Sequence, residues 1–338
     1  MGFCTCRLWR SAELRFVLHR PRRLELPISP PQKLHTSTRN LKLQSRKQSK
    51  APQNTQLDAF KMSTIATITA ENVTTLFPEV HTRLIGEDLE PTASLANGSN
   101  DTSDLAGYDE EQIRLMDEVC IVLDNNDQPI GSASKKACHL MTNIESGLLH
   151  RAFSCFLFDP KTKKLLLQQR ANEKITFPQM WTNTCCSHPL AHPAEAGKGD
   201  LVSNVDGAKR AAIRKLNHEL GIKSEQVPFS DFSFLTRIHY LAPSDGKWGE
   251  HEIDYILFIE AEPDLDVNVN EVQDTAWVSQ DELKQLFKDA ENREGKGKDF
   301  KFTPWFRLIC ESMLYEWWDA LVRGDLARYT GETDIRRM

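Results

Sequence analysis

The order of strand and helix patterns from Asp117 onward limits the fold of this chain more than any other feature. Short runs rich in β-branched and aromatic residues, bounded by turn residues, predict strands over 117–124, 129–134, 152–159, 164–170, 232–241, 252–260 and 275–278. Helical spacing predicts helices over 206–221, over 280–290 and from Thr303 onward. We therefore expect one α/β (α+β) domain over residues 117–338, in which helices flank a mixed sheet.

Local signals support several of these boundaries. Gly221 is a typical helix stop, and Thr303 followed by Pro304 is a typical helix start. The last helix carries an apolar stripe that is expected to face the core; its members are Phe306, Ile309, Cys310, Met313, Leu314, Trp317 and Leu321. The strand at 164–170 is expected to form a hairpin with 152–159 across a short turn.

The first third of the chain differs in charge and composition. The net charge of −6 divides into +10 for residues 1–61, with 13 Lys or Arg against 3 Asp or Glu, and −16 for the rest, with 29 against 45. An Arg-rich, acid-poor segment indicates an organelle presequence. The alternative is an extension without a targeting role, with Met62 as the functional start. We expect a cytoplasmic protein, with a mitochondrial location through residues 1–61 as the alternative.

Residues 62–116 are polar and poor in aromatic residues, so we interpret them as a flexible linker. Together with the basic extension they predict a disordered N-terminal tail ahead of the folded domain.

Composition excludes several classes of protein. A hydrophobic fraction of 40% with 27% charged residues is typical of a globular protein, and no apolar run approaches the ~18 residues of a membrane span. The eight cysteines lack the spacing of a disulfide framework, which indicates reduced thiols. The basic extension has no pattern of interleaved aromatic residues, so we expect no nucleic-acid partner. Nothing in the sequence requires a protein partner or a membrane.

The stretch 182–190 places two cysteines and a histidine within a few residues of each other. Cys186 and His188 are two positions apart, so both point to one face of an extended segment. A reactive thiol needs a polar, partly exposed pocket with cationic neighbours. The alternative is a core pair, Cys185 and Cys186, beside an incidental histidine, and this stretch alone does not decide between the two.

A second group of residues has the chemistry of a metal site. Glu250 and Glu252 share one face of a strand, with His251 on the other. Three imidazoles and two carboxylates suit a divalent ion such as Mn²⁺ or Zn²⁺; the candidate ligands are His139, His150, His188, Glu250 and Glu252. Taken singly, each histidine is equally compatible with an ordinary hydrogen-bonded or solvated side chain.

The helix that ends at Gly221 resembles the second half of the Nudix box, but it lacks most of the box's acidic residues. Lys215 and His218 stand where the box has metal-binding glutamates, and Asp206 stands in place of the first one. Glu219 is retained. Because Nudix hydrolysis needs several carboxylates to hold Mg²⁺, this helix predicts a Nudix fold that binds a diphosphate without cleaving it.

Six motifs in order resemble those of the type I isopentenyl-diphosphate Δ-isomerases, a family within the Nudix superfamily, and more those of its eukaryotic branch than of its bacterial one. They are K-K-A-C-H (135–139), G-L-L-H-R-A-F (147–153), T-N-T-C-C-S-H-P (182–189), E-L-G (219–221), W-G-E-H-E-I-D-Y (248–255) and T-P-W-F (303–306). The resemblance covers residues 117–325. It implies interconversion of isopentenyl and dimethylallyl diphosphate by a 1,3-allylic proton shift through a carbocation, which feeds isoprenoid and sterol biosynthesis.

The resemblance also implies roles for single residues. Cys186 and Glu252 are the acid–base pair, and Tyr240 hydrogen-bonds the catalytic carboxylate. The indole of Trp305 faces the cation, with Trp181 as a second candidate. The substrate-binding residues are Lys135, Arg170, Lys174 and Ser187. Glu219 and the Cys186 carbonyl bind the Mg²⁺ that accompanies the diphosphate, and the His/Glu group holds a second divalent ion, Mg²⁺, Mn²⁺ or Zn²⁺.

Two other interpretations compete with the isomerase. One is a Nudix-type diphosphate hydrolase, against which the residues at 215 and 218 argue. The other is a zinc-stabilised interaction module built on Cys185, Cys186 and the histidines. Structural zinc sites usually space their cysteines as C-x2–4-C, and adjacent cysteines do not fit that spacing.

Overall fold

The computed structural model of the chain describes residues 67–82 and 102–338. The basic extension predicted over 1–61 lies outside these residues. Among the described residues the helices are α2 (Val73–Leu76), α3 (Glu110–Leu115), α4 (Lys135–His139), α5 (Met141–Glu145), α6 (Leu201–Leu220), α7 (Gln280–Asn292), α8 (Pro304–Ile309) and α9 (Tyr315–Arg323). Within the same two ranges, no helix is both long and apolar enough to cross a membrane.

The described strands join in one mixed sheet. They are β1 (Val119–Leu123), β2 (Pro129–Ser134), β3 (His150–Phe158), β4 (Leu165–Arg170), β5 (Trp181–Thr182), β6 (Cys185–Ser187), β7 (Ser233–Pro243), β8 (Gly249–Glu260), β9 (Val272–Val278) and β10 (Ile335–Arg337). The main path through the sheet is β10-β7-β8-β3-β1-β2. The predicted α/β class with a mixed sheet is confirmed.

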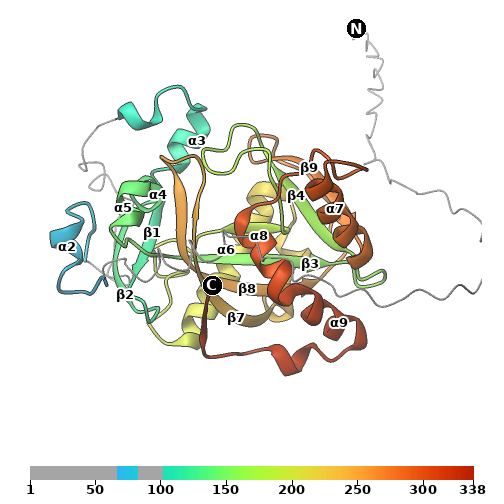
Figure 1. Cartoon of the computed structure of the whole chain (residues 1–338). Helices are drawn as coiled ribbons and strands as arrows, with labels where there is room; N and C mark the ends of the chain where they lie inside the picture. The colour runs from blue at the N-terminus through green and yellow to red at the C-terminus, as the bar shows by residue number, and fades with distance from the viewer. Residues whose placement is uncertain (1–66, 83–101) are drawn as a thin grey trace, which may run out of the picture. The chain divides into compact units, whose positions relative to one another are not determined.

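The parallel pair β3 and β8 forms the centre of the sheet, and it crosses the middle of the molecule in Figure 1. Its ladder begins where His150 lies opposite Glu252 and ends where Phe158 lies opposite Glu260. Strand β7 runs antiparallel to β8 and brings Tyr240 opposite Glu252. Three predicted site residues therefore meet at one level of the sheet, at the start of β3.

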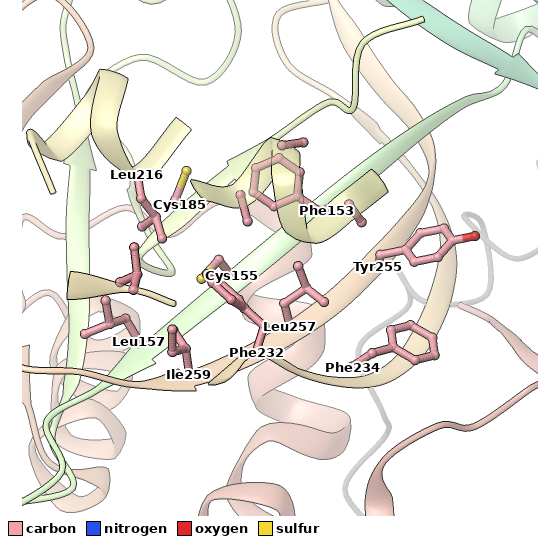
Figure 2. Packing of buried hydrophobic residues seen from close by; sticks show 14 of the residues in the cluster. Phe153, Cys155, Leu157, Cys185, Leu216, Phe232, Phe234, Tyr255, Leu257 and Ile259 are labelled. Atoms are coloured by element: carbon pink, nitrogen blue, oxygen red, sulfur yellow. The ribbon is translucent and has the colours of Figure 1, made fainter. Parts of the chain in front are cut away.

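The two faces of the sheet pack against different helices, because side chains alternate along each strand. On one face Phe153, Cys155 and Leu157 of β3 pack with Leu216 of α6 (Figure 2). Helix α6 ends at Gly221, which adopts φ 66°; a side chain there would place its Cβ 2.3 Å from the carbonyl oxygen of Asp266. The predicted stop of this helix is confirmed, although the helix begins five residues earlier than expected.

The opposite face is covered by α8 and α9, which are joined by a π-helical turn, η5 (Cys310–Leu314). Every member of the predicted apolar stripe is buried in this second core cluster, together with Phe156 and Phe158 of β3. Figure 1 shows α8 and α9 in front of the central strands. Thr303 precedes the helix as predicted, but its side chain does not cap it: its hydroxyl donates to Oγ1 of Thr182 instead, over 2.8 Å.

The predicted hairpin between 152–159 and 164–170 is mostly wrong. Strand β4 pairs with β3 only at Phe158 and Leu165, and along its length it pairs with β9 instead, from Leu165 opposite Val278 to Arg170 opposite Val272. The reason is that β6 occupies this edge of β3, where Phe153 lies opposite Ser187.

The expectation of a flexible linker over 62–116 is wrong for its two described stretches, 67–82 and 102–116, whereas 62–66 and 83–101 lie outside the described residues. In the stretch 67–82, Val73, Phe77 and Val80 are buried against Val122 of β1 and neighbouring residues, and His81 pairs with Ser132 of β2. In the stretch 102–116, helix α3 buries Gln112, Leu115 and, just beyond its end, Met116. These apolar side chains are too few and too scattered to show a clear helical period. The folded unit therefore begins before residue 117.

Candidate active site

A pocket opens where the starts of β8 and α8 meet the ends of β4, β6 and α6. It is lined by Gln112, Met116, Lys135, His139, Arg170, Lys174, Ile175, Thr176, Cys186, Ser187, His188, Lys215, Glu219, Tyr240, Glu250, Glu252 and Trp305. Of the predicted site residues, His150 and the second tryptophan candidate, Trp181, are absent from this lining. His150 lies fully buried beside the pocket, so the structure brings all the predicted site residues except Trp181 to one place.

Three histidines and two glutamates form a compact, buried group at one end of the pocket. The ring centres of His139, His150 and His188 are each 4.8 Å from the other two. One ligand atom from each of the three histidines and from Glu250 and Glu252 can be chosen so that all five lie within 4.8 Å of one another. Glu250 and Glu252 reach this group from the same face of β8, as their spacing predicted.

The polar atoms of this group have the chemistry and the burial of metal ligands. His139 Nε2, both ring nitrogens of His150, His188 Nδ1 and Glu250 Oε2 are buried and make no hydrogen bond of ordinary geometry in the described part of the chain. His139 Nε2 nevertheless lies 2.8 Å from Glu250 Oε2, and His150 Nε2 lies 3.3 Å from Glu252 Oε1, as atoms converging on one ion would. Buried polar atoms are normally paired. The Nδ1 atom of His139 lies 2.6 Å from the carbonyl oxygen of Lys135, so it carries the proton and Nε2 presents a lone pair to the group. These five residues fit a divalent metal ion.

Two of these ligand candidates have shifted pKa values. Burial, together with the two neighbouring imidazoles of His139 and His150, holds the pKa of His188 well below its usual value, so the ring is neutral and able to bind a metal. Burial alone would raise the pKa of Glu252, but contact with His150 and a hydrogen bond from Tyr240 hold it below its usual value.

Glu252 therefore joins the His/Glu group to the open part of the pocket. Its Oε1 lies 2.9 Å from His188 Nε2, and its Oε2 accepts a hydrogen bond of 2.5 Å from the Tyr240 hydroxyl. Burial and the adjacent carboxylate raise the pKa of Tyr240, so the tyrosine remains a donor. The predicted contact between Tyr240 and the carboxylate is present.

Cys186 lies in β6 opposite Ser154 and is half-buried at the pocket wall. The structure decides between the two interpretations of the stretch 182–190, a reactive thiol and a core cysteine pair. Cys185 belongs to the core cluster around α6, whereas Cys186 and His188 both line the pocket. Burial raises the pKa of Cys186 to about 12, and the nearby Arg170 only partly opposes this. The expected cationic neighbour is present, but it does not activate a thiolate; the group is a thiol.

Trp305 forms another wall of the pocket. Its Nε1 donates to Asn183 Oδ1 over 3.2 Å, and the ring of Phe177 meets it edge to face with centres 5.2 Å apart. Phe177 adopts φ 48°, a costly conformation for a bulky residue. It is held there by Arg170, whose Nε donates to its carbonyl oxygen over 3.1 Å, and by Ser244, whose hydroxyl accepts from its N–H over 2.9 Å. Trp181, the second candidate, stacks on Phe300 and does not line the pocket.

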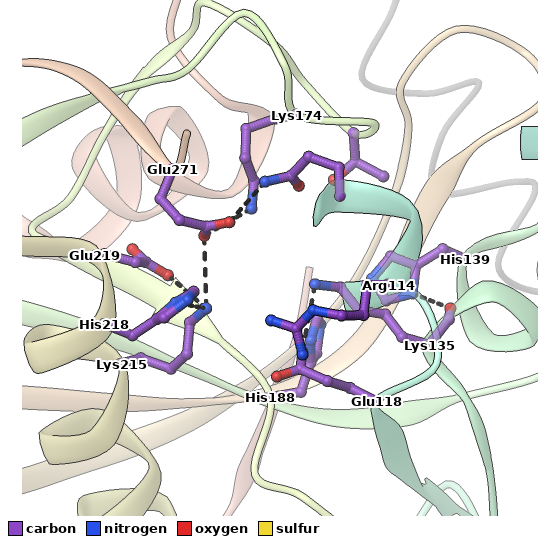
Figure 3. Close-up of polar contacts among 12 residues, drawn as sticks. Arg114, Glu118, Lys135, His139, Lys174, His188, Lys215, His218, Glu219 and Glu271 are labelled. Carbon is purple, nitrogen blue, oxygen red and sulfur yellow. Dashed lines mark hydrogen bonds and ion pairs between the residues drawn. The ribbon is translucent and has the colours of Figure 1, made fainter. Parts of the chain in front are cut away.

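Basic side chains gather at the other end of the pocket (Figure 3). Lys174 Nζ lies 2.9 Å and Lys215 Nζ 3.5 Å from Oε2 of Glu271, and Lys215 lies 3.2 Å from Glu219. Burial lowers the pKa of Lys174 to about 8, although Glu271 opposes this shift. Lys135 and Arg170 complete this basic end; Arg170 uses its Nε and Nη2 on the 176–177 carbonyls.

Several residues of the pocket were not predicted. Gln112 donates to Glu271 Oε1 over 2.7 Å, and Met116 follows it on the same segment. The sequence signal for this helix is Asp109, whose side chain accepts from the N–H groups of Glu111 and Gln112. Glu271 lies in an irregular loop without any such signal.

The zinc-stabilised module is not supported. The one group of metal-competent residues within the described ranges contains no cysteine. The thiol of Cys185 instead lies 3.4 Å from Glu219 Oε2 in the interior.

Comparison with known proteins agrees with this fold. The NUDIX domain family matches residues 148–306, from the segment before β3 to the start of α8. The mixed sheet, α6 and a metal-competent pocket thus define a Nudix-domain protein.

The relatives of this chain show which family of Nudix-domain proteins it belongs to. An isopentenyl-diphosphate delta-isomerase of Aspergillus fumigatus is 63% identical over 279 residues, which are 80% of this chain and 96% of that protein. One from Schizosaccharomyces pombe is 59% identical over 62% of this chain and 88% of its own length, and one from Mesocricetus auratus is 49% identical over 68% and 96%. The chain belongs to the isopentenyl-diphosphate delta-isomerase family, and the family resemblance read from its motifs is confirmed.

Proposed function

We propose that this chain interconverts isopentenyl diphosphate and dimethylallyl diphosphate, the reaction named for its relatives. The observation that carries the proposal is the placement of Cys186 and Glu252 in one pocket, between a metal-competent group and a set of buried cations. The product of this reaction feeds isoprenoid biosynthesis, including sterols.

The basic end of the pocket would bind the diphosphate. Lys135, Arg170 and Lys174 supply positive charge, and the Ser187 hydroxyl lies in the same lining. The Nη1 atom of Arg170 makes no hydrogen bond within the described residues, so it is available to a phosphate oxygen. Glu219 supplies one carboxylate for the Mg²⁺ that accompanies the diphosphate, because Mg²⁺ commonly combines one or two carboxylates with substrate phosphates.

The His/Glu group would hold a second divalent ion, Mg²⁺, Mn²⁺ or Zn²⁺, through His139, His150, His188, Glu250 and Glu252. When bound, such an ion stabilises the ionised carboxylates and polarises groups beside it. The mixture of imidazole and carboxylate ligands favours Mn²⁺ or Zn²⁺ over Mg²⁺, which prefers oxygen.

The reaction needs one proton donor and one proton acceptor at the same alkene. One of Cys186 and Glu252 adds a proton to the terminal methylene carbon, which leaves a tertiary cation. The other removes a proton from the carbon next to the diphosphate-bearing end, and the double bond forms there. The C–O bond to the diphosphate stays intact, and the substrate gains one proton and loses one, so its composition does not change.

The pocket walls suit this cation. The indole of Trp305 lines the pocket, and the π face of such a ring stabilises a desolvated positive charge by roughly 0.5–2 kcal/mol. Tyr240 holds Glu252 in position through their hydrogen bond.

The sequence of α6 argues against hydrolysis of the diphosphate. Lys215 places an ammonium group between Glu219 and Glu271, where a Nudix hydrolase would need a metal ion held by carboxylates. Phosphorus NMR of the full chain with isopentenyl diphosphate and Mg²⁺ tests this directly. We expect the diphosphate signals to persist without orthophosphate or free diphosphate; their release would show a hydrolase.

The cellular location and the partners form a separate proposal, which rests on the sequence alone. We propose a cytoplasmic enzyme that acts on a small molecule and needs no protein partner, with a mitochondrial location through residues 1–61 as the alternative. A fluorescent reporter fused to residues 1–61 distinguishes the two, because a targeting segment would carry the reporter into mitochondria.

A further inference from the structure

A chain of hydrogen bonds runs behind the His/Glu group, on the opposite side of β8. Arg337 of β10 places Nη1 2.6 Å from His239 Nδ1 and donates through Nη2 to the carbonyl oxygen of Asn125 over 2.7 Å. His239 Nε2 lies 2.9 Å from His251 Nε2, and His251 Nδ1 lies 2.9 Å from the carbonyl oxygen of Leu148. Both histidines are at least 95% buried.

The partners at the two ends of this series of hydrogen bonds require tautomers of His239 and His251 that are compatible with each other. A guanidinium group only donates, so His239 Nδ1 accepts and its proton lies on Nε2, facing His251. A carbonyl oxygen only accepts, so His251 carries its proton on Nδ1 and accepts through Nε2. The two requirements agree at the contact between the rings, which therefore has one proton. Burial and Arg337 lower the pKa of His239 to about 4, which is consistent with a neutral ring.

This series of hydrogen bonds ends next to the metal-competent residues. His251 lies between Glu250 and Glu252 in sequence and points to the other face of β8. Leu148 precedes His150 by two residues. The ladder between β3 and β8 begins only at His150 and Glu252, so the bond from His251 to Leu148 extends the pairing of the two segments beyond the ladder.

We propose that Arg337 is a positioning residue for the metal site. By fixing the tautomer of His239, whose Nε2–H faces His251, it holds His251 in the orientation that donates to Leu148. This ties the segment before His150 to β8 and so sets the spacing between His150 and the two glutamates. This inference rests on the proposed metal site and extends it to a residue of the last strand. Residues that orient metal ligands through hydrogen bonds commonly change metal affinity by about 10–100-fold when they are replaced.

The neighbouring Arg336 provides a matched control. It lies on the same short strand, but its side chain pairs with the partly exposed Glu332 over 2.7 Å and takes no part in the histidine chain. The variants are Arg337→Met, which removes the donor and keeps most of the length, Arg337→Lys, which keeps a donor, and Arg336→Met.

The test measures Mn²⁺ binding to the full chain by electron paramagnetic resonance, together with nitrogen NMR of ¹⁵N-labelled histidines. We expect Arg337→Met to weaken Mn²⁺ binding by about 10-fold and to lose the single-tautomer signals of His239 and His251. Arg337→Lys should stay within about twofold of the unmodified protein in Mn²⁺ affinity and keep these signals, and Arg336→Met should match the unmodified protein.

Unchanged Mn²⁺ affinity in Arg337→Met, or an equal loss in Arg337→Lys or Arg336→Met, would overturn the positioning role while leaving the metal site in place. If the unmodified chain does not bind Mn²⁺ at all, the proposed metal site itself is wrong and the inference falls with it. Thermal unfolding of each variant separates these outcomes from a general loss of structure, since a merely structural role would lower stability without a selective loss of Mn²⁺ affinity.

Discussion

The Tyr240 hydroxyl donates to Oε2 of Glu252 over 2.5 Å, while Oε1 of the same carboxylate faces His188 at 2.9 Å. Glu252 is thus held from both sides, by a neutral donor from β7 and by the histidine that follows β6. Its orientation toward the pocket depends on Tyr240 of β7 and on His188, the residue after β6.

Replacing Tyr240 with Phe should lower kcat by about 10–100-fold with little change in KM, because a hydrogen bond to a charged group contributes about 1.5–3 kcal/mol. Steady-state kinetics measure this. Tyr255→Phe is the control: its hydroxyl donates to Asp127, away from the pocket, so stability should fall while kcat is kept. Equal kcat losses in both variants would contradict the role of Tyr240.

The affinity for inorganic diphosphate should fall as pH rises above about 8. Burial lowers the pKa of Lys174 to about 8, so above this pH the amine is neutral in the free protein, whereas a bound anion favours the ammonium form. Arg stays charged throughout this range, so Lys174→Arg should lack this loss. Calorimetric titrations between pH 7 and 9.5 give the diphosphate affinity of the unmodified protein and of Lys174→Arg. The protonation of diphosphate itself changes with pH, but it affects both proteins equally and cancels in the ratio of the two affinities. A ratio that does not change with pH would count against a perturbed Lys174.

Lys215→Met should destabilise the chain by about 3–5 kcal/mol, because it leaves Glu219 and Glu271 in the interior without their shared partner. Urea unfolding measures the free energy. Lys161→Met is the comparison, since Lys161 pairs with Glu262 in the open, and a surface pair contributes little. Similar losses in the two variants would show that the interior ion pairs are not important for folding.

Removal of divalent ions should lower the thermal unfolding temperature. An ion at 100 times its Kd adds about 2.7 kcal/mol of stability, which for a domain of this size is about 5–10 °C. Glu250→Gln should respond less to added Mn²⁺, while Glu291→Gln, which alters an exposed partner of Arg307, should respond fully. An equal Mn²⁺ response in both variants would place the ion elsewhere.

The predictions from sequence succeeded where a pattern is local. The existence of strands β3 and β8, the Gly221 stop of α6 and the apolar stripe of the last helix each follow from residues close together in the chain. The pairing of β4 with β9 was missed because it depends on which edge of β3 is free, and β6 takes that edge.

Prediction of the site was limited in the same way, to residues that belong to local patterns. Its motif residues were predicted because they recur as short patterns in a known family. Gln112 and Glu271 were not, since they meet through a contact across more than 150 residues, from a helix interpreted as a linker. The upward shift in the pKa of Cys186 could not be predicted either, because the degree of burial that causes it is set by the whole fold and not by its neighbours in sequence.

Proton NMR of the reaction in D₂O tests the central proposal most directly. With the full chain, isopentenyl diphosphate, Mg²⁺ and Mn²⁺, we predict the methyl signals of dimethylallyl diphosphate with deuterium incorporated. The Cys186→Ala and Glu252→Gln variants should slow their appearance by at least about 100-fold. Release of phosphate without a shifted double bond, or full isomerisation by either variant, would contradict the assignment of Cys186 and Glu252 as the acid–base pair of an isomerase.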